Sequence, residues 1–150
     1  MMVFRGISEL ERAVGTYLGH SDWYTVTQKQ IDAFAEASGD FQWIHVDPGK
    51  AAQGPFGATV AHGFLTLSLV PLLTGQIYRV EGVKMSVNYG ADKLRFPSPL
   101  PVNSKVRAGV ELLSVEAGNG GYRVAARVTV EREGSNKPAC VVEALSLVLP

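Results

Sequence analysis

The most apolar segment of the chain reads Gly63-Phe64-Leu65-Thr66-Leu67-Ser68-Leu69-Val70-Pro71-Leu72-Leu73-Thr74. Its apolar residues leave no wholly polar face, which predicts one helix covered on nearly all sides. A helix that crosses a bilayer needs about 20 apolar residues, so this segment is too short to span a membrane. It therefore predicts a central core helix around which the rest of the chain is wrapped.

The part of the chain after Gly75 is typical of antiparallel strands joined by short turns. Tyr122 to Glu131 shows the alternation of apolar and polar residues expected of a half-exposed strand. One long apolar helix followed by about four long strands predicts an α+β fold, with a curved sheet around the helix. No repeat or linker indicates a second unit, so residues 1–150 are predicted to form a single domain. The predicted strands are Lys84 to Tyr89, Val102 to Val115, Tyr122 to Glu131 and Cys140 to Leu149.

Two capping boxes predict helices ahead of the central segment. Ser8-Glu9-Leu10-Glu11 predicts a short helix from Glu9 to Val14, and Thr27 with Gln30 predicts a second helix that Gly39 ends. Aromatic and β-branched residues at 23–26 predict a strand between the two helices. Residues 41–60 show no sustained periodicity, which predicts a long loop.

Composition and charge exclude several classes of protein. The 150 residues carry 14 basic and 14 acidic side chains, so no basic surface predicts binding to nucleic acid or to an anionic membrane. Cys140 is the single cysteine, which rules out an internal disulfide and fits a reducing compartment. The first residues lack the pattern of a secretory signal. We therefore expect a cytoplasmic protein.

The polar stretch before the central helix contains groups suited to acid–base chemistry. Asp40 and His45 lie five residues apart, and Ala61-His62-Gly63 precedes the helix, where free backbone N–H groups favour an anion. Each group also has a structural explanation, since Asp40 could form a turn and His62 could hydrogen-bond to nearby backbone. No set of histidine, cysteine and acidic residues has the spacing of a zinc site, so no metal is expected.

The order of these groups resembles the MaoC-like, R-specific enoyl-CoA hydratases, which have the hot-dog fold. The matching elements are Asp40, His45, Asp47-Pro48, Phe56-Gly57, Ala61-His62-Gly63, Asn88-Tyr89-Gly90 and residues 93–99, over roughly Thr27 to Arg107. The likeness is greatest to short single-domain bacterial members, including nodulation-protein-N-like proteins. The family motif Asp-x-Asn-Pro-x-His reads Asp40-Phe41-Gln42-Trp43-Ile44-His45 here, so Gln42 and Trp43 replace asparagine and proline.

The resemblance implies reversible addition of water to a trans-2-enoyl-CoA, giving an (R)-3-hydroxyacyl-CoA. Asp40 and His45 would hold the water, and the Gly63 N–H would serve as the oxyanion hole for the thioester oxygen. The sequence leaves open which of the two side chains takes the water proton. The resemblance further implies a homodimer with sheets joined edge to edge, and no cofactor apart from the coenzyme A of the substrate. The implied substrate-binding residues are Gln42, Trp43, Ile44, Phe56, His62 and Arg95.

Two other functions share the predicted fold. A hot-dog acyl-CoA thioesterase commonly carries an acid on the central helix, whereas the helix predicted here has none. A non-catalytic binder of acyl thioesters is kept open by Gln42 and Trp43. Because one fold supports many functions, the fold does not choose among the three.

Overall fold

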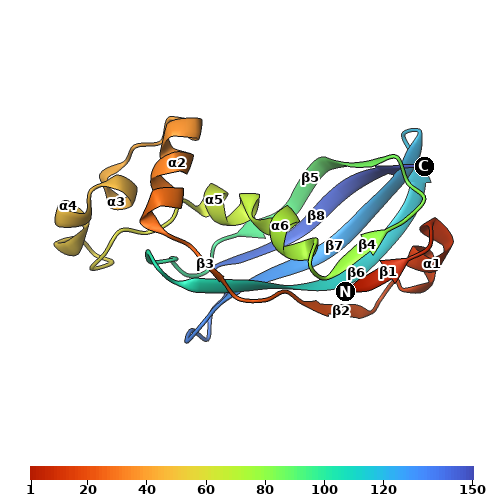
Figure 1. Cartoon of the computed structure of the whole chain (residues 1–150), viewed down its shortest axis with the longest axis horizontal. Coiled ribbons are helices and arrows are strands. Elements are labelled where there is room, and N and C mark those ends of the chain that lie inside the picture. The colour runs from red at the N-terminus through yellow and green to blue at the C-terminus, as the bar shows by residue number, and fades with distance from the viewer.

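One antiparallel sheet forms the body of the computed structural model, which describes residues 1–150. Its strand order is β2-β6-β7-β8-β5, and the short β3 also pairs with β6. Figure 1 shows the central helical segment lying across this curved sheet, as the α+β hot-dog prediction requires. The strands are β2 (Tyr17–His20), β3 (Tyr24–Thr25), β5 (Met85–Arg95), β6 (Lys105–Gly118), β7 (Gly121–Arg132) and β8 (Cys140–Leu149).

The four long predicted strands are confirmed, with some differences at their ends. β8 has its predicted bounds, whereas β5 continues six residues further because register shifts after Asn88 and Asp92 preserve its pairing with β8. β6 begins at Lys105 rather than Val102, because Asn103 has a positive φ of 65° and turns the chain there. The strand predicted at 23–26 is confirmed only as the two-residue β3.

The central segment is two short helices, α5 (Gly63–Ser68) and α6 (Val70–Thr74), so the prediction of one helix is wrong. The break at Leu69 has a local cause, since Pro71 has no N–H to bond the preceding turn. The prediction that the segment is covered on nearly all sides is also wrong. Leu73 is fully buried against the sheet, but Phe64 is 65% exposed and Leu72 is 48% exposed. None of the helices has the length and apolar character needed to cross a membrane.

A second, two-stranded sheet was not predicted. β1 (Met2–Phe4) pairs in parallel with β4 (Tyr78–Val80), and α1 (Ile7–Arg12) follows β1. The capping box predicted at Ser8 is wrong, because the helix begins at Ile7 and Ser8 lies inside it. Glu9 instead accepts a hydrogen bond from the Arg5 N–H at 2.7 Å.

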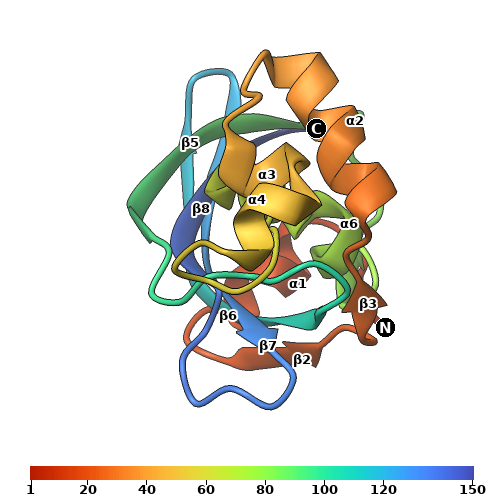
Figure 2. The same cartoon turned by 90° about the vertical axis from the view of Figure 1, so that its left-hand side faces the viewer.

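Three helices gather at one end of the sheet (Figure 1 and Figure 2). α2 (Gln28–Ser38) has its predicted caps, since the Thr27 hydroxyl accepts the Gln30 N–H at 3.3 Å and Gly39 is left-handed with φ 79°. The predicted loop at 41–60 is wrong in part, because it contains α3 (Trp43–Val46) and α4 (Pro48–Ala52). These short helices place the acid–base residues.

Candidate active site

Asp40 and His45 face each other, although no regular element carries both. Asp40 lies on the link that follows α2, and His45 lies on α3. The Asp40 Oδ2 and the His45 Nε2 are 3.9 Å apart, which is longer than a direct hydrogen bond. The Asp40 side chain is 52% exposed and the His45 side chain only 8%. The pair therefore joins a solvent-facing carboxylate to a buried imidazole.

The hydrogen bonds of His45 define which ring nitrogen is free. Its Nδ1 lies 2.7 Å from the Val60 carbonyl oxygen, and a carbonyl can only accept. Nδ1 therefore carries the proton of the neutral ring, and Nε2 presents a lone pair toward Asp40. Gln28 fixes the backbone as well, since it donates to the His45 carbonyl at 2.8 Å and accepts from the Thr59 hydroxyl.

His62 packs directly on this pair. Its ring stacks on the His45 ring, with centroids 3.8 Å apart and 21° between the planes. Its Nε2 lies 3.0 Å from the main-chain oxygen of Asp40, so the expected bond to backbone is present, to a residue 22 positions away. The side chain is buried.

Gly63 begins α5 next to His62, and its N–H donates to no group of the protein. A Cβ at this position would lie 2.8 Å from two ring carbons of Phe96, which follows β5. The absence of a side chain at Gly63 therefore lets Phe96 pack against the start of the helix.

The residues that were predicted to bind substrate differ in what they contact. Gln42 donates its main-chain N–H to the Asp40 carboxylate at 3.3 Å, whereas its side chain forms no hydrogen bond. Trp43 packs its ring on Gly54 and lies under the Lys50 ammonium, 4.7 Å from the ring centroid.

Ile44 is half-buried, and its carbonyl oxygen accepts the Val60 N–H at 3.0 Å. Phe56 is 45% exposed in the turn after α4. Arg95 is exposed at the end of β5 and donates only to the Lys93 carbonyl, so no hydrogen bond or ion pair links it to Asp40 or His45.

Asp40, His45 and His62 place one potential metal-ligand atom each within 4.8 Å of one another. Their geometry does not suit a shared ion, because imidazole lone pairs lie in the ring plane and the two rings are stacked almost parallel. Carbonyl oxygens also occupy the His45 Nδ1 and the His62 Nε2. Cys140 is buried in the core of the sheet, away from these three residues.

Sequence reasoning missed three groups at this site. The Val60 carbonyl fixes the His45 ring, Gln28 fixes the His45 backbone, and Phe96 packs on Gly63. The sequence carries no signal for Val60, because it acts through its main chain. Gln28 and Phe96 are distant in the sequence from the residues that they contact.

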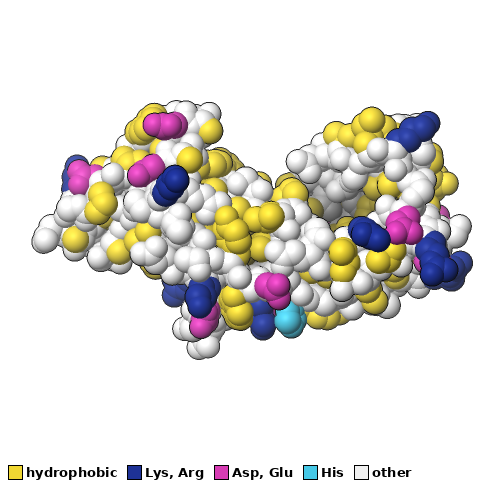
Figure 3. Space-filling view, viewed as in Figure 1, with side chains coloured by type: hydrophobic (Ala, Val, Ile, Leu, Met, Phe, Trp, Pro, Cys, Tyr) yellow, Lys and Arg dark blue, Asp and Glu magenta, His cyan; other side chains and the backbone are white.

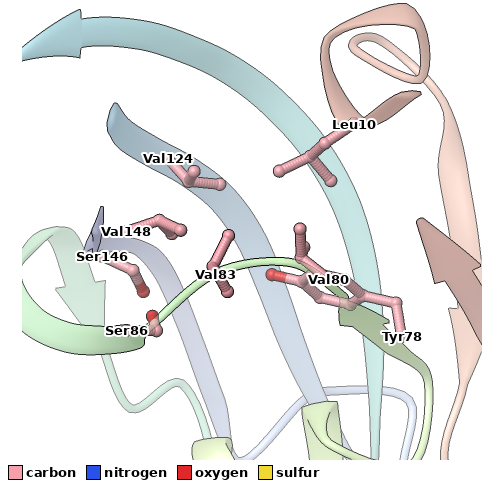
Figure 4. A pocket seen from close by; sticks show the side chains of 8 residues that line it. All are labelled: Leu10, Tyr78, Val80, Val83, Ser86, Val124, Ser146 and Val148. Carbon is pink, nitrogen blue, oxygen red and sulfur yellow. The ribbon is translucent and has the colours of Figure 1, made fainter. Parts of the chain in front are cut away.

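A separate cavity of about 100 Å³ is lined in part by Tyr78 and Val80 of β4. Figure 1 shows β4 at the end of the sheet away from α3. Figure 3, which is viewed from the same side as Figure 1, shows a hollow in the surface beside the curved end of the sheet. Figure 4 shows the Ser86 and Ser146 hydroxyl groups pointing toward each other on its wall. Burial raises the pKa of Tyr78, whose hydroxyl also borders the cavity. The remaining lining is apolar: Leu10, Val80, Val83, Val124 and Val148.

Fold and site together define a hot-dog α+β protein with an aspartate–histidine pair beside the residues that begin α5. Residues 9–134 match the MaoC like domain, and the chain belongs to that family. It is 53% identical to 3-hydroxyacyl-thioester dehydratase Z of Mycobacterium tuberculosis over 146 residues, covering 97% of each chain. It is 39% identical to nodulation protein N of Rhizobium leguminosarum bv. viciae, covering 95% of this chain and 90% of that one.

Among solved structures, the chain is similar to the (R)-hydratase from A. caviae involved in PHA biosynthesis. The two are 28% identical with a TM-score of 0.73, and the match covers 91% of this chain and 96% of the other. Family membership and this structural likeness agree with the resemblance drawn from the motif residues.

Proposed function

We propose that this protein is an R-specific enoyl-CoA hydratase, which adds water reversibly to trans-2-enoyl-CoA to give (R)-3-hydroxyacyl-CoA. The observation that carries the proposal is the His45 Nε2 lone pair opposite the Asp40 carboxylate at 3.9 Å. The names of the relatives support it, since one is a 3-hydroxyacyl-thioester dehydratase and another an (R)-specific enoyl-CoA hydratase. Dehydration and hydration are the two directions of one reaction.

The spacing of the pair suits one water molecule. A water with hydrogen bonds of about 2.8 Å fits between atoms 3.9 Å apart, donating one hydrogen to each. His45 takes the water proton as the oxygen attacks C3 of the substrate. The negative charge on Asp40 offsets the positive charge that His45 gains. The proton then passes to C2, so that the reaction balances and His45 returns to its neutral form.

The unpaired Gly63 N–H is the proposed donor to the thioester oxygen. Negative charge collects on this oxygen while C2 is carbanion-like, and a fixed N–H stabilises it without reorganisation. One such donor contributes about 3 kcal/mol in other enzymes, or roughly a hundredfold in rate. Gly63 directly follows His62, whose ring packs on the catalytic pair.

The proposed substrate is an acyl thioester of coenzyme A, with no further cofactor and no metal. Trp43 and Ile44 lie on α3 with His45, Phe56 lies in the turn after α4, and Gln42 contacts Asp40 through its main chain. We assign these residues, together with the exposed Arg95, to the binding of substrate.

We also propose that the protein is a homodimer joined through β5. This strand pairs with β8 on one side only, so its outer edge has unpaired backbone groups. Met85, Val87 and Tyr89 of β5 are 53%, 44% and 49% exposed. An open eleven-residue edge with apolar side chains fits a second copy of the same strand. Light scattering after gel filtration should give twice the chain mass of 16.1 kDa, and the chain mass itself would contradict the dimer.

The experiment that tests the activity follows the loss of the conjugated enoyl absorbance when purified protein is mixed with crotonyl-CoA. Asp40→Asn and His45→Gln are expected to lose about a hundredfold or more in kcat/KM, because the first removes the negative charge beside His45 and the second removes the base. Chiral analysis of the product should give the R alcohol. Release of free thiol without hydration would point to a thioesterase, and binding without turnover to a non-catalytic binder.

A further inference from the structure

His62 contacts both members of the catalytic pair and has no part in the proton transfers described above. Its Nε2–H donates to the Asp40 carbonyl at 3.0 Å, and its ring stacks on His45 at 3.8 Å. Phe34 of α2 packs on the same ring at 4.8 Å between centroids. The side chain is only 3% exposed, so it is held between the elements that carry the pair.

The hydrogen bonding of His62 excludes a relay of protons through its ring. The Asp40 carbonyl can only accept, so the Nε2 carries the hydrogen. The other nitrogen, Nδ1, is buried and has no hydrogen-bond partner. His62 therefore offers one donor and one flat apolar face, with no second group to or from which a proton could move.

Asp40 depends on that donor because its own segment is weakly held. Its N–H bonds to the Ser38 hydroxyl at 3.3 Å and its Oδ1 accepts the Gln42 N–H at 3.3 Å, both within two residues and both long. The bond from His62 is the only one that ties Asp40 to a distant part of the chain. Without the hydrogen bond from His62, only the exposed segment between α2 and α3 would set the position of the Asp40 carboxylate.

We propose that His62 is a positioning residue that fixes Asp40 relative to His45, so that one water molecule fits between them. The assignment rests on the proposed hydratase function. His62 acts at two points. It donates a hydrogen bond to the Asp40 main chain, and its ring stacks on the His45 ring and fixes the orientation of that ring. A displacement of about 1 Å at a catalytic group costs roughly a hundredfold in rate, so a single buried donor has a large effect here.

Two variants separate the donor from the ring. His62→Phe keeps an aromatic ring for stacking and loses the N–H, whereas His62→Gln keeps an N–H at a similar reach and loses the ring. His62→Phe is expected to lower kcat/KM for crotonyl-CoA about a hundredfold, and His62→Gln to recover at least tenfold of that loss. Equal activities of the two variants, or an unchanged His62→Phe, would overturn the proposal. Glutamine cannot transfer protons as imidazole does, so the recovery also excludes proton transfer by His62.

A double-mutant cycle with Asp40→Asn distinguishes positioning from general loss of folded protein. If His62 acts through Asp40, His62→Phe costs less than about threefold when the carboxylate is already gone. A full hundredfold loss in that background would mean that the variant is simply damaged, and would overturn the proposal.

Crystal structures of the two variants give a readout that does not depend on turnover. The separation of Asp40 Oδ2 and His45 Nε2 should stay near 3.9 Å in His62→Gln and change by about 1 Å in His62→Phe. An unchanged separation in His62→Phe would refute the positioning role. If the wild-type protein does not hydrate enoyl-CoA, the hydratase proposal fails, while this structural comparison still decides what His62 does.

Discussion

Replacing Gly63 by alanine adds one methyl group at the start of α5, where the structure has no room for it. Gly63 does not have a positive φ, so its backbone accepts alanine without strain. The new Cβ would lie 2.8 Å from two ring carbons of Phe96, well inside normal contact distance. Overpacking of this kind costs about 1 to 3 kcal/mol, and roughly 2 to 4 °C of Tm are lost per kcal/mol in a domain of this size.

Relief of this close contact would shift the main chain at residue 63. The shift should reduce activity, because the proposed oxyanion donor is the Gly63 N–H itself. We expect Gly63→Ala to lower kcat/KM for crotonyl-CoA by about 10- to 100-fold. A second change, Phe96→Leu, removes ring atoms from the contact and should restore part of both Tm and kcat/KM. Gly49→Ala is the matched control, since a Cβ there meets only Asp47 Oδ1 at an ordinary 3.6 Å.

The reasoning is refuted if Gly63→Ala keeps full activity and Tm, because the close approach to Phe96 would then cost nothing. Recovery of Tm without recovery of kcat/KM in the Phe96→Leu background has a different meaning. It would show that alanine blocks the substrate itself, and that packing against Phe96 is not the reason for the lost rate.

Three further outcomes follow from single contacts. Thr27→Ala removes the hydroxyl that caps α2 and should lower the free energy of unfolding in urea by about 1 kcal/mol, whereas Thr27→Ser should keep most of it. Leu73→Ala leaves a cavity under α6 at a fully buried position and should cost about 2 to 5 kcal/mol in the same assay; Leu72→Ala, at a half-exposed position, should cost much less. Burial raises the pKa of the Cys140 thiol from 9.0 to about 11, so the unfolded chain loses this proton first and stability should fall as pH rises from 9 toward 11. Urea titrations across that range should show the fall in wild type and a smaller one in Cys140→Ala.

Local signals in the sequence predicted local structure well. The Thr27 cap of α2 depends on Gln30, and the Gly39 stop depends on Ala35. Each pair lies within about one helical turn, and both features are present. The same kind of signal was present for α4. The Asp47 side chain caps this helix by accepting the Lys50 N–H at 3.0 Å, and Pro48 is its first residue. The prediction of a loop over residues 41–60 missed that helix. At Ser8, the capping box predicted the helix start wrongly, since the helix begins at Ile7 with Gly6 at the N-cap.

Features that depend on distant residues could not be predicted. β1 and β4 pair although 76 positions separate partners such as Met2 and Tyr78, and neither strand has a strong pattern of its own. The resemblance to the hydratase family implied that Asp40 and His45 lie close together, and the structure brings the two side chains within 3.9 Å. Nothing in the sequence indicated that the Val60 carbonyl selects the His45 tautomer, or that His62 stacks on the His45 ring. Their roles in catalysis remain predictions that the variants above test.

The order of the long strands has a consequence for how the chain folds during synthesis. β6, β7 and β8 are consecutive antiparallel neighbours, so each can pair as soon as the next has been made. The helices around Asp40 and His45 leave the ribosome earlier, before any of the strands on which α5 and α6 pack. The catalytic segment must therefore wait for the C-terminal hairpins, and a chain stalled before β6 would expose the apolar residues of α5 and α6.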